Sequence, residues 1–356
     1  MGSHARPNRI HRTGVRIAMV ALVGAALPIT ASGLAQAATP GATHSADEND
    51  QQGSEATAAA AHKQGTQRQS GSAQAGPQHA AKGKTAAAQA VKDQDAPQIH
   101  ADHAFLLDAR DGSQERELWG GAKADESVSM ASTTKIMTAM VVLKHPEWLN
   151  RQITVKQEYR DYVQKVGGST ADLQTGDRLT VEQLLHAMMI PSGDDAAMAL
   201  ADNFGAGATA DARIADFVNQ MNVEAQQLGL AGTHFDGFDG ISHGSNYSTA
   251  RDLAKLGQRA MLQPVFADIV KNKQYKAEAP AANGHIRYYT WDNTNKLLGS
   301  YDGALGIKTG SGPEAGYALV FAAERGNRTL VGAILKDDQA SRFDDAAKML
   351  DWGFAH

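Results

Sequence analysis

The sequence predicts an α/β (α+β) fold, in which both ends of one large domain form a sheet and a helical region is inserted between them. Three observations support this prediction. An apolar run at 104–108 has the character of a strand, and so do two further runs at 317–321 and 329–335. The long segment between these ends carries apolar residues at helical spacing. The order of strand, helices and strands favours a mixed sheet.

The elements follow in order from local signals. Residues 104–108 are predicted as a strand, and Asp111-Gly112 as a turn after it. Apolar residues at helical spacing predict helices over 135–143 and over 181–203, the second broken near Pro191. The strands at 317–321 and 329–335 flank Arg325-Gly326-Asn327-Arg328, a turn that makes them a hairpin. A last helix is expected over 344–352.

The N-terminus has the pattern of an export signal, and residues 1–37 are expected to be a signal peptide. Four arginines between residues 6 and 16 precede an apolar run at 17–27, and Ala35-Gln36-Ala37 forms a small-x-small cleavage site. The apolar run is short for a membrane span of about 20 residues. An uncleaved anchor is the alternative. Either way the protein is expected to be exported, in the cell wall or at the outer face of the membrane.

Residues 38–97 are expected to be a disordered linker, and residues 98–356 a single globular domain. The linker is rich in Ala, Gln and Gly with almost no large apolar side chains, so it cannot bury enough surface to offset its ordering entropy. About 260 residues then suffice for one domain with a large core.

Composition excludes several functions. A net charge of −5 gives no electrostatic basis for nucleic-acid binding, and the absence of cysteine excludes disulfides and thiolate sites. Of 13 histidines only His100 and His103 are close together, with no further ligand nearby. Neither a metal nor a cofactor is expected, and no obligate protein partner is predicted.

Ser132-Thr133-Thr134-Lys135 places a hydroxyl and an amine three residues apart. If the chain is helical from Ser132 to about His145, the two side chains share a face. The lysine nitrogen would then take the serine proton, as a serine nucleophile requires. At the start of a helix, Ser132 would also lie near unpaired backbone N–H groups. The alternative is an N-cap serine followed by a solvated lysine.

Two later segments supply further polar groups. Ser192-Gly193-Asp194 follows Pro191, where a short break between helices would hold a hydroxyl rigidly. Lys308-Thr309-Gly310-Ser311 precedes the hairpin, on or beside an edge strand, where lysine and threonine suit a substrate carboxylate. Gly310 would let a substrate backbone approach. Taken singly, the segments also fit a helix cap and an exposed strand lysine before a turn.

In this order, the three segments resemble the serine D-alanyl-D-alanine carboxypeptidases, the low-molecular-weight penicillin-binding proteins. The resemblance extends over residues 98–356. Besides the segment 131–139, similar stretches are Gly176-Asp177, Met221-Asn222, Thr233-His234-Phe235, Tyr247-Ser248-Thr249-Ala250-Arg251-Asp252, Tyr301-Asp302-Gly303 and Leu350-Asp351-Trp352-Gly353-Phe354. The family implies a β-lactamase/transpeptidase-like fold, with an antiparallel sheet flanked by helices and an inserted helical region.

The resemblance implies acyl transfer through a serine ester. Ser132 would attack the carbonyl between the two terminal D-alanines of a peptidoglycan stem peptide, Lys135 would act as general base, and Ser192 would relay the proton. Lys308 and Thr309 would hold the terminal carboxylate, and the backbone N–H groups of Ser132 and Ser311 would form the oxyanion hole. β-Lactam antibiotics would be covalent inhibitors. Burial and the charge of Lys308 would lower the pKa of Lys135.

Two residues leave alternatives open. Asp194 stands where the family usually has asparagine, and an ionised carboxylate accepts hydrogen bonds but cannot donate them. It either pairs with Lys135 or Lys308, which would oppose the base mechanism, or is turned away, with Asp195 or a water in its role. Arg342 either assists with the substrate carboxylate or is an ordinary arginine at a helix start.

Two rival functions share these motifs. A serine β-lactamase of class A needs a glutamate with an asparagine four residues later, between the second and third motifs. Glu224 and Glu278 are the glutamates there, and Leu228 and Ala282 stand at the asparagine positions. The other rival is a non-catalytic wall-binding protein that keeps the groove without turnover, for which Asp194 and the long tether argue.

Overall fold

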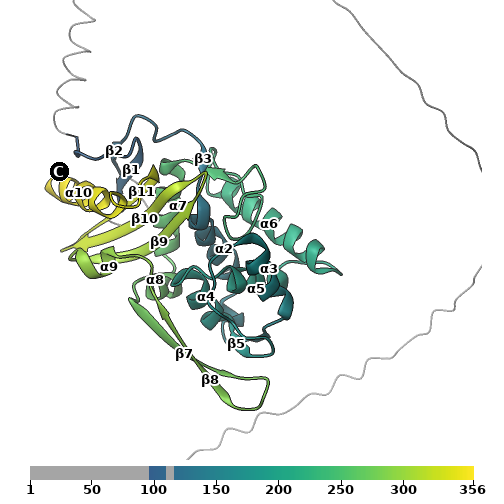
Figure 1. Cartoon of the computed structure of the whole chain (residues 1–356). Coiled ribbons are helices and arrows are strands. Elements are labelled where there is room, and N and C mark those ends of the chain that lie inside the picture. The colour runs from purple at the N-terminus through teal and green to yellow at the C-terminus, as the bar shows by residue number, and fades with distance from the viewer. Residues whose placement is uncertain (1–95, 110–115) are drawn as a thin grey trace, which may run out of the picture. The chain divides into compact units, whose positions relative to one another are not determined.

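A five-stranded antiparallel sheet carries the fold, in the strand order β2-β1-β11-β10-β9 (Figure 1). The computed structural model describes residues 96–109 and 116–356. The predicted signal peptide, nearly all of the predicted linker and the turn at Asp111-Gly112 lie outside these residues. The strands are β1 (His103–Asp108), β2 (Arg116–Gly120), β9 (Ala304–Gly312), β10 (Gly316–Arg325) and β11 (Arg328–Asp337).

Both ends of the domain contribute to this sheet, as predicted. β1 lies beside β11, with Leu106 opposite Gly332, and β10 and β11 form the expected hairpin. The expectation of a mixed sheet is wrong, because all four pairings are antiparallel. The reason is local: β9, β10 and β11 follow one another through short turns, which can join only antiparallel neighbours.

The sheet is buried on both faces, which explains the uninterrupted apolar runs in β10 and β11. Alternate residues of the central strands β1, β10 and β11 belong to two different cores. Leu319 and Phe321 pack on one face with Met349 and Leu350 of the last helix, α10 (Arg342–Ala355), whereas Val320 faces the core of the helical region. Figure 1 shows α10 on one side of the sheet and the helical region on the other.

The helical region lies between β2 and β9 in sequence, as predicted. Its helices are α2 (Lys135–Val142), α3 (Gln157–Val166), α4 (Val181–Met189), α5 (Asp194–Phe204), α6 (Ala210–Gln227), α7 (Ala250–Met261), α8 (Pro264–Val270) and α9 (Leu297–Ser300), with 3₁₀ turns η1 (Ala131–Thr134) and η2 (Pro146–Trp148). All eight residues of α2 are buried, so this helix is the centre of the region. Side chains at one end of α2 are therefore held rigidly.

The remaining strands of the described residues form three two-stranded ribbons, none of which was predicted. They are β3 (Val128–Ser129) with β6 (Tyr247–Ser248), β4 (Gln152–Thr154) with β5 (Arg178–Thr180), and β7 (Gln274–Pro280) with β8 (Ile286–Asp292). The β7–β8 hairpin projects from the body of the domain (Figure 1).

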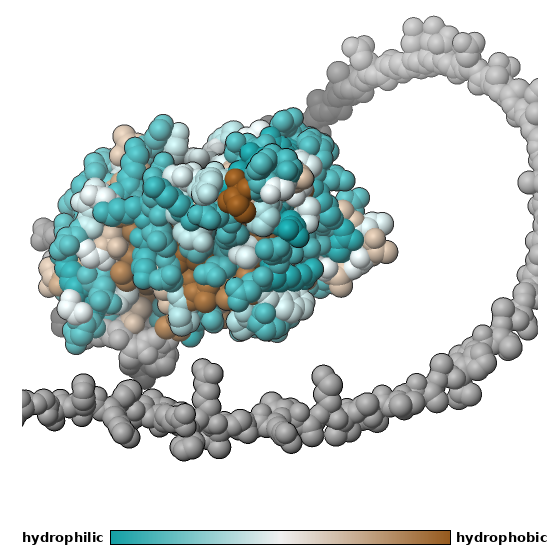
Figure 2. Space-filling view, turned by 90° about the horizontal axis from the view of Figure 1, so that it is seen from below, coloured by the Kyte–Doolittle hydropathy of each residue, from teal (hydrophilic) through white to brown (hydrophobic). Residues whose placement is uncertain are grey.

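Hydrophobic residues on the surface are confined to small patches on the face that Figure 2 shows. The surface between them is mostly hydrophilic, as expected for a domain whose apolar residues are in the core. Across 96–109 and 116–356, no helix combines the length and apolar character that a membrane crossing requires.

Candidate active site

Ser132 and Lys135 lie in contact at the start of α2. Lys135 Nζ donates a hydrogen bond to Ser132 Oγ over 2.9 Å. The expected helix begins differently, because residues 131–134 form the 3₁₀ turn η1 and the α-helix starts only at Lys135. A 3₁₀ turn has three residues per turn, so side chains at i and i+3 are aligned. The predicted contact therefore forms through a tighter turn than expected.

Lys135 is fully buried and has three polar neighbours. Besides Ser132, its Nζ donates to the backbone carbonyl of Asp239 over 2.8 Å and lies 2.5 Å from Asp194 Oδ1. The Asp194 side chain is only 2% exposed, so this ion pair is screened little by solvent. The contact to Oδ1 is an ion pair without hydrogen-bond alignment. Of the alternatives open for Asp194, pairing with Lys135 is the one found.

Neighbouring carboxylates have separate tasks at the start of α5. Asp194 Oδ2 accepts from the backbone N–H of Ser169 over 2.9 Å. Asp195 accepts from the backbone N–H groups of Ala171 and Leu173 and from the Thr170 hydroxyl, at 2.9 to 3.1 Å. Because these hydrogen bonds hold Asp195 against the loop at 170–173, the expectation that Asp195 takes over the role of Asp194 is wrong.

Ser192 lies in the break between α4 and α5, where the sequence predicted a rigidly held hydroxyl. It is buried, and its backbone is left-handed with φ of 70°, a conformation that non-glycine residues rarely adopt. Its Oγ accepts from Lys308 Nζ over 2.9 Å. A strained residue of this kind is retained where the surroundings fix it, which is common in active sites.

The third predicted segment lies on β9, the edge strand of the sheet. Lys308 is buried, and burial together with the positive charge of Lys135 lowers the pKa of Lys308 well below its usual value. The Thr309 hydroxyl bonds to that of Thr294 at 2.6 Å. Ser311 follows two residues later and is exposed.

Gly310 allows β9 to approach the turn that carries Ser132. A Cβ atom at Gly310 would lie 3.0 Å from the Met130 carbonyl oxygen and 3.2 Å from the Ser132 nitrogen. These distances are tight for backbone atoms, so a side chain at this position would push β9 and the nucleophile turn apart by a few tenths of an ångström. The expected purpose of Gly310 was the approach of a substrate, and the contact found is with the nucleophile turn itself.

Arg342 is the first residue of α10 and also reaches the motif on β9. Its Nη1 donates to the carbonyl oxygen of Gly310 over 3.0 Å, and its guanidinium lies over the Tyr317 ring, 5.1 Å from the centroid. Arg342 is therefore a residue at a helix start that also contacts the segment expected to bind substrate, and its assistance with the substrate carboxylate stays a prediction.

Asp239 and Tyr162 belong to the site but were missed by the sequence analysis. The Tyr162 hydroxyl donates to Asp239 Oδ2 over 2.6 Å, and the backbone N–H of Ile241 donates to Oδ1 over 2.9 Å. Burial raises the pKa of the Asp239 carboxyl. These contacts fix the loop whose carbonyl binds Lys135. No sequence signal indicates such a role, because every residue has a backbone carbonyl.

The remaining predicted residues lie elsewhere. His100 contacts Asp345 and His103 lies near Glu126, so the two histidines do not converge on one point. No group of three or more His, Cys, Asp or Glu side chains could hold a metal ion within the described part of the chain.

Of the two glutamates considered for a class A β-lactamase, one is in an ion pair and the other is exposed. Glu224 pairs with Lys144, and Glu278 is exposed on β7.

A depression lies beside β3 and β6, near the turn that carries Ser132. It has a volume of about 400 Å³ and is lined by Ser129, Asn246, Tyr247 and Glu314 among others. Asn246 Nδ2 donates to Thr134 Oγ1 over 3.0 Å, which joins this wall to the turn that carries Ser132.

Comparisons with known proteins identify the family of the chain. A family model described as D-alanyl-D-alanine carboxypeptidase matches residues 89–339. The D-alanyl-D-alanine carboxypeptidase of Streptomyces sp. strain K15 is 50% identical over 235 residues, which are 65% of this chain and 81% of the relative. The Escherichia coli carboxypeptidase DacC is 35% identical over 269 residues, 73% of this chain and 62% of the relative.

Comparisons with solved structures indicate the same family. The crystal structure of the Streptomyces K15 DD-transpeptidase aligns with a TM-score of 0.70 at 47% identity, covering 73% of this chain and 99% of that chain. A penicillin-binding protein homologue from Mycobacterium tuberculosis aligns with a TM-score of 0.61 at 30% identity, covering 73% of this chain and 93% of that chain. The chain spans less than two thirds of DacC and of the Bacillus subtilis relative DacF.

Proposed function

Because the chain belongs to the D-alanyl-D-alanine carboxypeptidase family, we propose that Ser132 is the nucleophile of a serine peptidase that cleaves the terminal D-Ala–D-Ala bond of peptidoglycan stem peptides. The hydrogen bond of 2.9 Å from Lys135 Nζ to Ser132 Oγ carries this proposal. It places an amine where a general base must be to take the serine proton. β-Lactam antibiotics would acylate the same oxygen.

Acylation begins when neutral Lys135 takes the proton from Ser132 Oγ, and this oxygen attacks the carbonyl carbon between the two D-alanines. The carbon–nitrogen bond then breaks, and the leaving D-alanine amine needs a proton. The Ser192 hydroxyl supplies that proton and is reprotonated by Lys308, whose Nζ lies 2.9 Å away. Water then attacks the Ser132 ester and passes one proton through Ser192 back to Lys308, while Lys135 returns its proton to the Ser132 oxygen as the ester bond breaks. The shortened peptide leaves as its carboxylic acid, which ionises in solvent.

The developing oxyanion is assigned to the backbone N–H groups of Ser132 and Ser311. The close packing of β9 on the nucleophile turn at Gly310 supports this assignment, because it brings the two segments side by side. β9 is an edge strand, so a substrate backbone can add to it as a further strand. The substrate would then lie along the strand that also carries Lys308.

The terminal carboxylate of the substrate is assigned to Lys308 and Thr309. Lys308 supplies positive charge, and the Thr309 hydroxyl is oriented by its bond to Thr294. Arg342 acts through the Gly310 carbonyl, which it holds at 3.0 Å, and adds positive charge near the site. The charge of a bound carboxylate would favour the ammonium form of Lys308, which opposes the effect of burial.

A weakly active or non-catalytic penicillin-binding protein is the second candidate, and one observation favours it. Lys135 Nζ lies 2.5 Å from Asp194 Oδ1, and a lysine charged in such an ion pair cannot accept a proton. Turnover would then be slower than in a protein that lacks this carboxylate.

The experiment that separates the candidates follows two products. Wild-type protein and the variant Ser132→Ala are incubated with a fluorescent penicillin and, separately, with a stem pentapeptide. We expect labelling and D-alanine release from the wild type and neither from the variant. Labelling without D-alanine release would favour the second candidate, and labelling of Ser132→Ala would refute the assignment of the nucleophile.

We also propose that the protein is exported and acts outside the cytoplasm, with residues 1–37 removed and residues 38–97 serving as a tether. The basic segment, the apolar run and Ala35-Gln36-Ala37 support this. N-terminal sequencing of the protein from culture medium or cell walls should begin at Ala38. A start at the first residues, in the membrane fraction, would instead indicate an anchor.

A further inference from the structure

Glu314 is the one charged residue that lines the depression beside β3 and β6. The other residues that line this depression of about 400 Å³ are three serines, Val128, Gly244, Asn246 and Tyr247. Glu314 lies in the turn between β9 and β10 and is exposed. Across the described residues, no hydrogen bond or ion pair engages its carboxylate. The depression therefore presents a negative charge to whatever binds in it.

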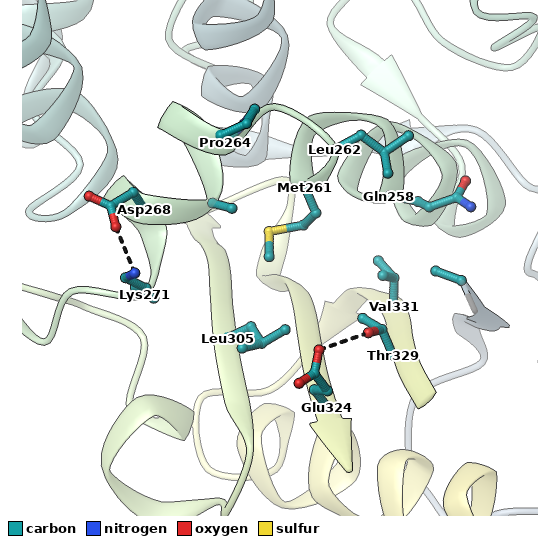
Figure 3. A pocket seen from close by; sticks show the side chains of 12 residues that line it. Gln258, Met261, Leu262, Pro264, Asp268, Lys271, Leu305, Glu324, Thr329 and Val331 are labelled. Carbon is teal, nitrogen blue, oxygen red and sulfur yellow. Dashed lines mark hydrogen bonds and ion pairs between the residues drawn. The ribbon is translucent and has the colours of Figure 1, made fainter. Parts of the chain in front are cut away.

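The cavity between α7, α8 and strands β9 to β11 differs in this respect (Figure 3). Its volume is about 330 Å³, and its charged side chains already have partners. Lys271 pairs with Asp268 at 2.6 Å, and Glu324 accepts a hydrogen bond from the Thr329 hydroxyl over 3.3 Å. Of these two cavities, the depression beside β3 and β6 is the one that presents a charge without a partner among the described residues.

The direction of the bound substrate brings its third residue toward this depression. The terminal carboxylate is assigned to Lys308 and Thr309, and the scissile carbonyl to the N–H of Ser311, which comes later in β9. A substrate strand in this register runs antiparallel to β9, so the residues before the scissile bond continue past Gly312 toward Glu314. A strand advances by about 3.3 Å per residue, so the third residue of the stem peptide already lies beside the end of β9.

The opposite wall of the depression is continuous with the turn that carries the nucleophile. Ser129 ends β3, and the turn η1 with Ser132 begins directly after Met130. β9 packs closely on the Met130 carbonyl, which would lie 3.0 Å from a Cβ atom at Gly310. The ends of β3 and of β9 therefore form two walls next to the reacting carbonyl of the substrate.

The side chains of the depression define the chemistry that it accepts. The carboxylate of Glu314 attracts a cation, and the hydroxyl oxygens of Ser129 and Ser242 can accept hydrogen bonds from an ammonium group. Tyr247 is 39% exposed, so its ring offers a surface on which an aliphatic stem can pack. A side chain with an apolar stem and a terminal ammonium fits these groups, whereas a terminal carboxylate would meet a like charge.

We propose that the depression beside β3 and β6 is the subsite for the third residue of the stem peptide, and that it selects a side chain ending in a free ammonium group. Glu314 pairs with the ammonium and determines the specificity, and Tyr247 contacts the stem. The proposal rests on the proposed function, because the direction of the substrate on β9 follows from the groups assigned to its carboxylate and oxyanion.

The test compares three forms of the tripeptide Nα-acetyl-L-lysyl-D-alanyl-D-alanine, whose lysine stands for the third residue. Its ε-nitrogen is free, acetylated or succinylated, which makes the side chain a cation, a neutral group or an anion. In the wild type, kcat/KM for D-alanine release should be about fivefold higher for the cation than for the neutral peptide, as expected for a solvent-accessible ion pair. The anion should be the poorest substrate, and about 1 M salt should reduce both differences.

Two variants test the role of Glu314. Glu314→Gln removes the charge, so the cationic and neutral peptides should react at equal rates. Glu314→Lys reverses the charge and should prefer the anionic peptide to the cationic one. Glu324→Gln is the matched control, because it makes the same change of charge near the other end of β10, outside the depression (Figure 3). It should keep the preference of the wild type. Glu314 and Glu324 are both exposed, so all three variants should keep the melting temperature of the wild type.

Binding to Ser132→Ala separates this proposal from the proposed function. That variant lacks the nucleophile, so calorimetry measures its affinity for the three peptides without turnover. If the wild type releases no D-alanine from any of them, the proposed function fails, and the order of the affinities still decides the subsite. Equal affinities of Ser132→Ala for the cationic and neutral peptides, the absence of measurable binding included, overturn the proposal. A preference for the cation that Glu314→Gln retains overturns it as well.

Discussion

Replacing Asp194 with asparagine should raise the acylation rate of Ser132 at neutral pH. Asp194 Oδ1 lies 2.5 Å from Lys135 Nζ, and both side chains are buried. At an effective dielectric constant of about 20, this separation corresponds to an attraction of about 6 to 7 kcal/mol. Desolvation of two buried charges consumes several kcal/mol of that attraction, which leaves a net preference of about 1 to 3 kcal/mol for the charged pair.

Asparagine removes the charge with little change in shape. Its carbonyl can keep the hydrogen bond from the Ser169 N–H, now 2.9 Å long, which turns the amide N–H₂ toward the lone pair of neutral Lys135. The fraction of Lys135 able to accept a proton then increases. A preference of about 1 to 3 kcal/mol corresponds to an increase in acylation of about 5-fold to 150-fold.

The assay is the second-order rate of labelling by a fluorescent penicillin, measured from about pH 6 to about pH 10. The variant should label faster than the wild type, because the carboxylate 2.5 Å from Lys135 Nζ is absent. Asp195→Asn is the matched control, because Asp195 is equally buried but does not contact Lys135. It should lose stability without a change in the shape of the pH profile.

One result would refute this reasoning. If Asp194→Asn labels more than about tenfold more slowly at neutral pH with an unchanged melting temperature, the carboxylate itself takes part in proton transfer. The ion pair would then be a working part of the catalytic machinery.

Three further predictions concern Lys308, Gly310 and Asp337. Burial, followed by the charge of Lys135, lowers the pKa of Lys308, so Lys308 loses its positive charge at a lower pH than an ordinary lysine. The KM for a stem pentapeptide should therefore rise with pH below the usual lysine range. The variant Lys308→Arg does not titrate and should show no such rise. Gly310→Ala should slow penicillin labelling by about tenfold or more with a small change in melting temperature, because the added Cβ would press on the turn that carries Ser132. An unchanged labelling rate would contradict the need for the close packing of β9 on that turn. Burial raises the pKa of Asp337 from 3.8 to about 6, so the folded protein holds a proton on this carboxyl more tightly than the unfolded chain does. The resulting contribution to the free energy of unfolding is complete below about pH 4 and is lost as the pH rises through about 6. Asp337→Asn should therefore be more stable than the wild type above about pH 6, by about 1 to 3 kcal/mol in urea unfolding, and equal stability at neutral pH would contradict the shift.

The sequence predicted the elements whose signals are local. The apolar runs at 317–321 and 329–335 and the turn between them gave the hairpin, because both faces of these strands are buried in the middle, where nearly every position is apolar. Ribbons such as β3 with β6 were missed, since two residues are too few to show a period. The mixed sheet was wrong because the order of elements does not give strand direction when the connection is a whole helical region.

The candidate site was predicted in part for a similar reason. Ser132, Lys135, Ser192 and Lys308 carry side chains whose chemistry is visible in the sequence, and the structure brings them together. Asp239 contributes a backbone carbonyl, which no residue type signals. For Asp194 the sequence left several partners open, and the choice among them is made by three-dimensional packing against Ser169 and Lys135.

The pairing of β1 with β11 has a consequence for how the chain folds. Asp108 at the end of β1 forms an ion pair with Arg328 at the start of β11, across a sequence separation of 220 residues. Contacts between such distant residues slow folding, because the entropy of closing a long loop is lost before the contact is gained. During synthesis the centre of the sheet cannot form until β11 is complete. The polypeptide therefore stays without its central sheet until almost its entire length is available, and a truncation before β11 should prevent the catalytic groups from assembling even though all of them are present.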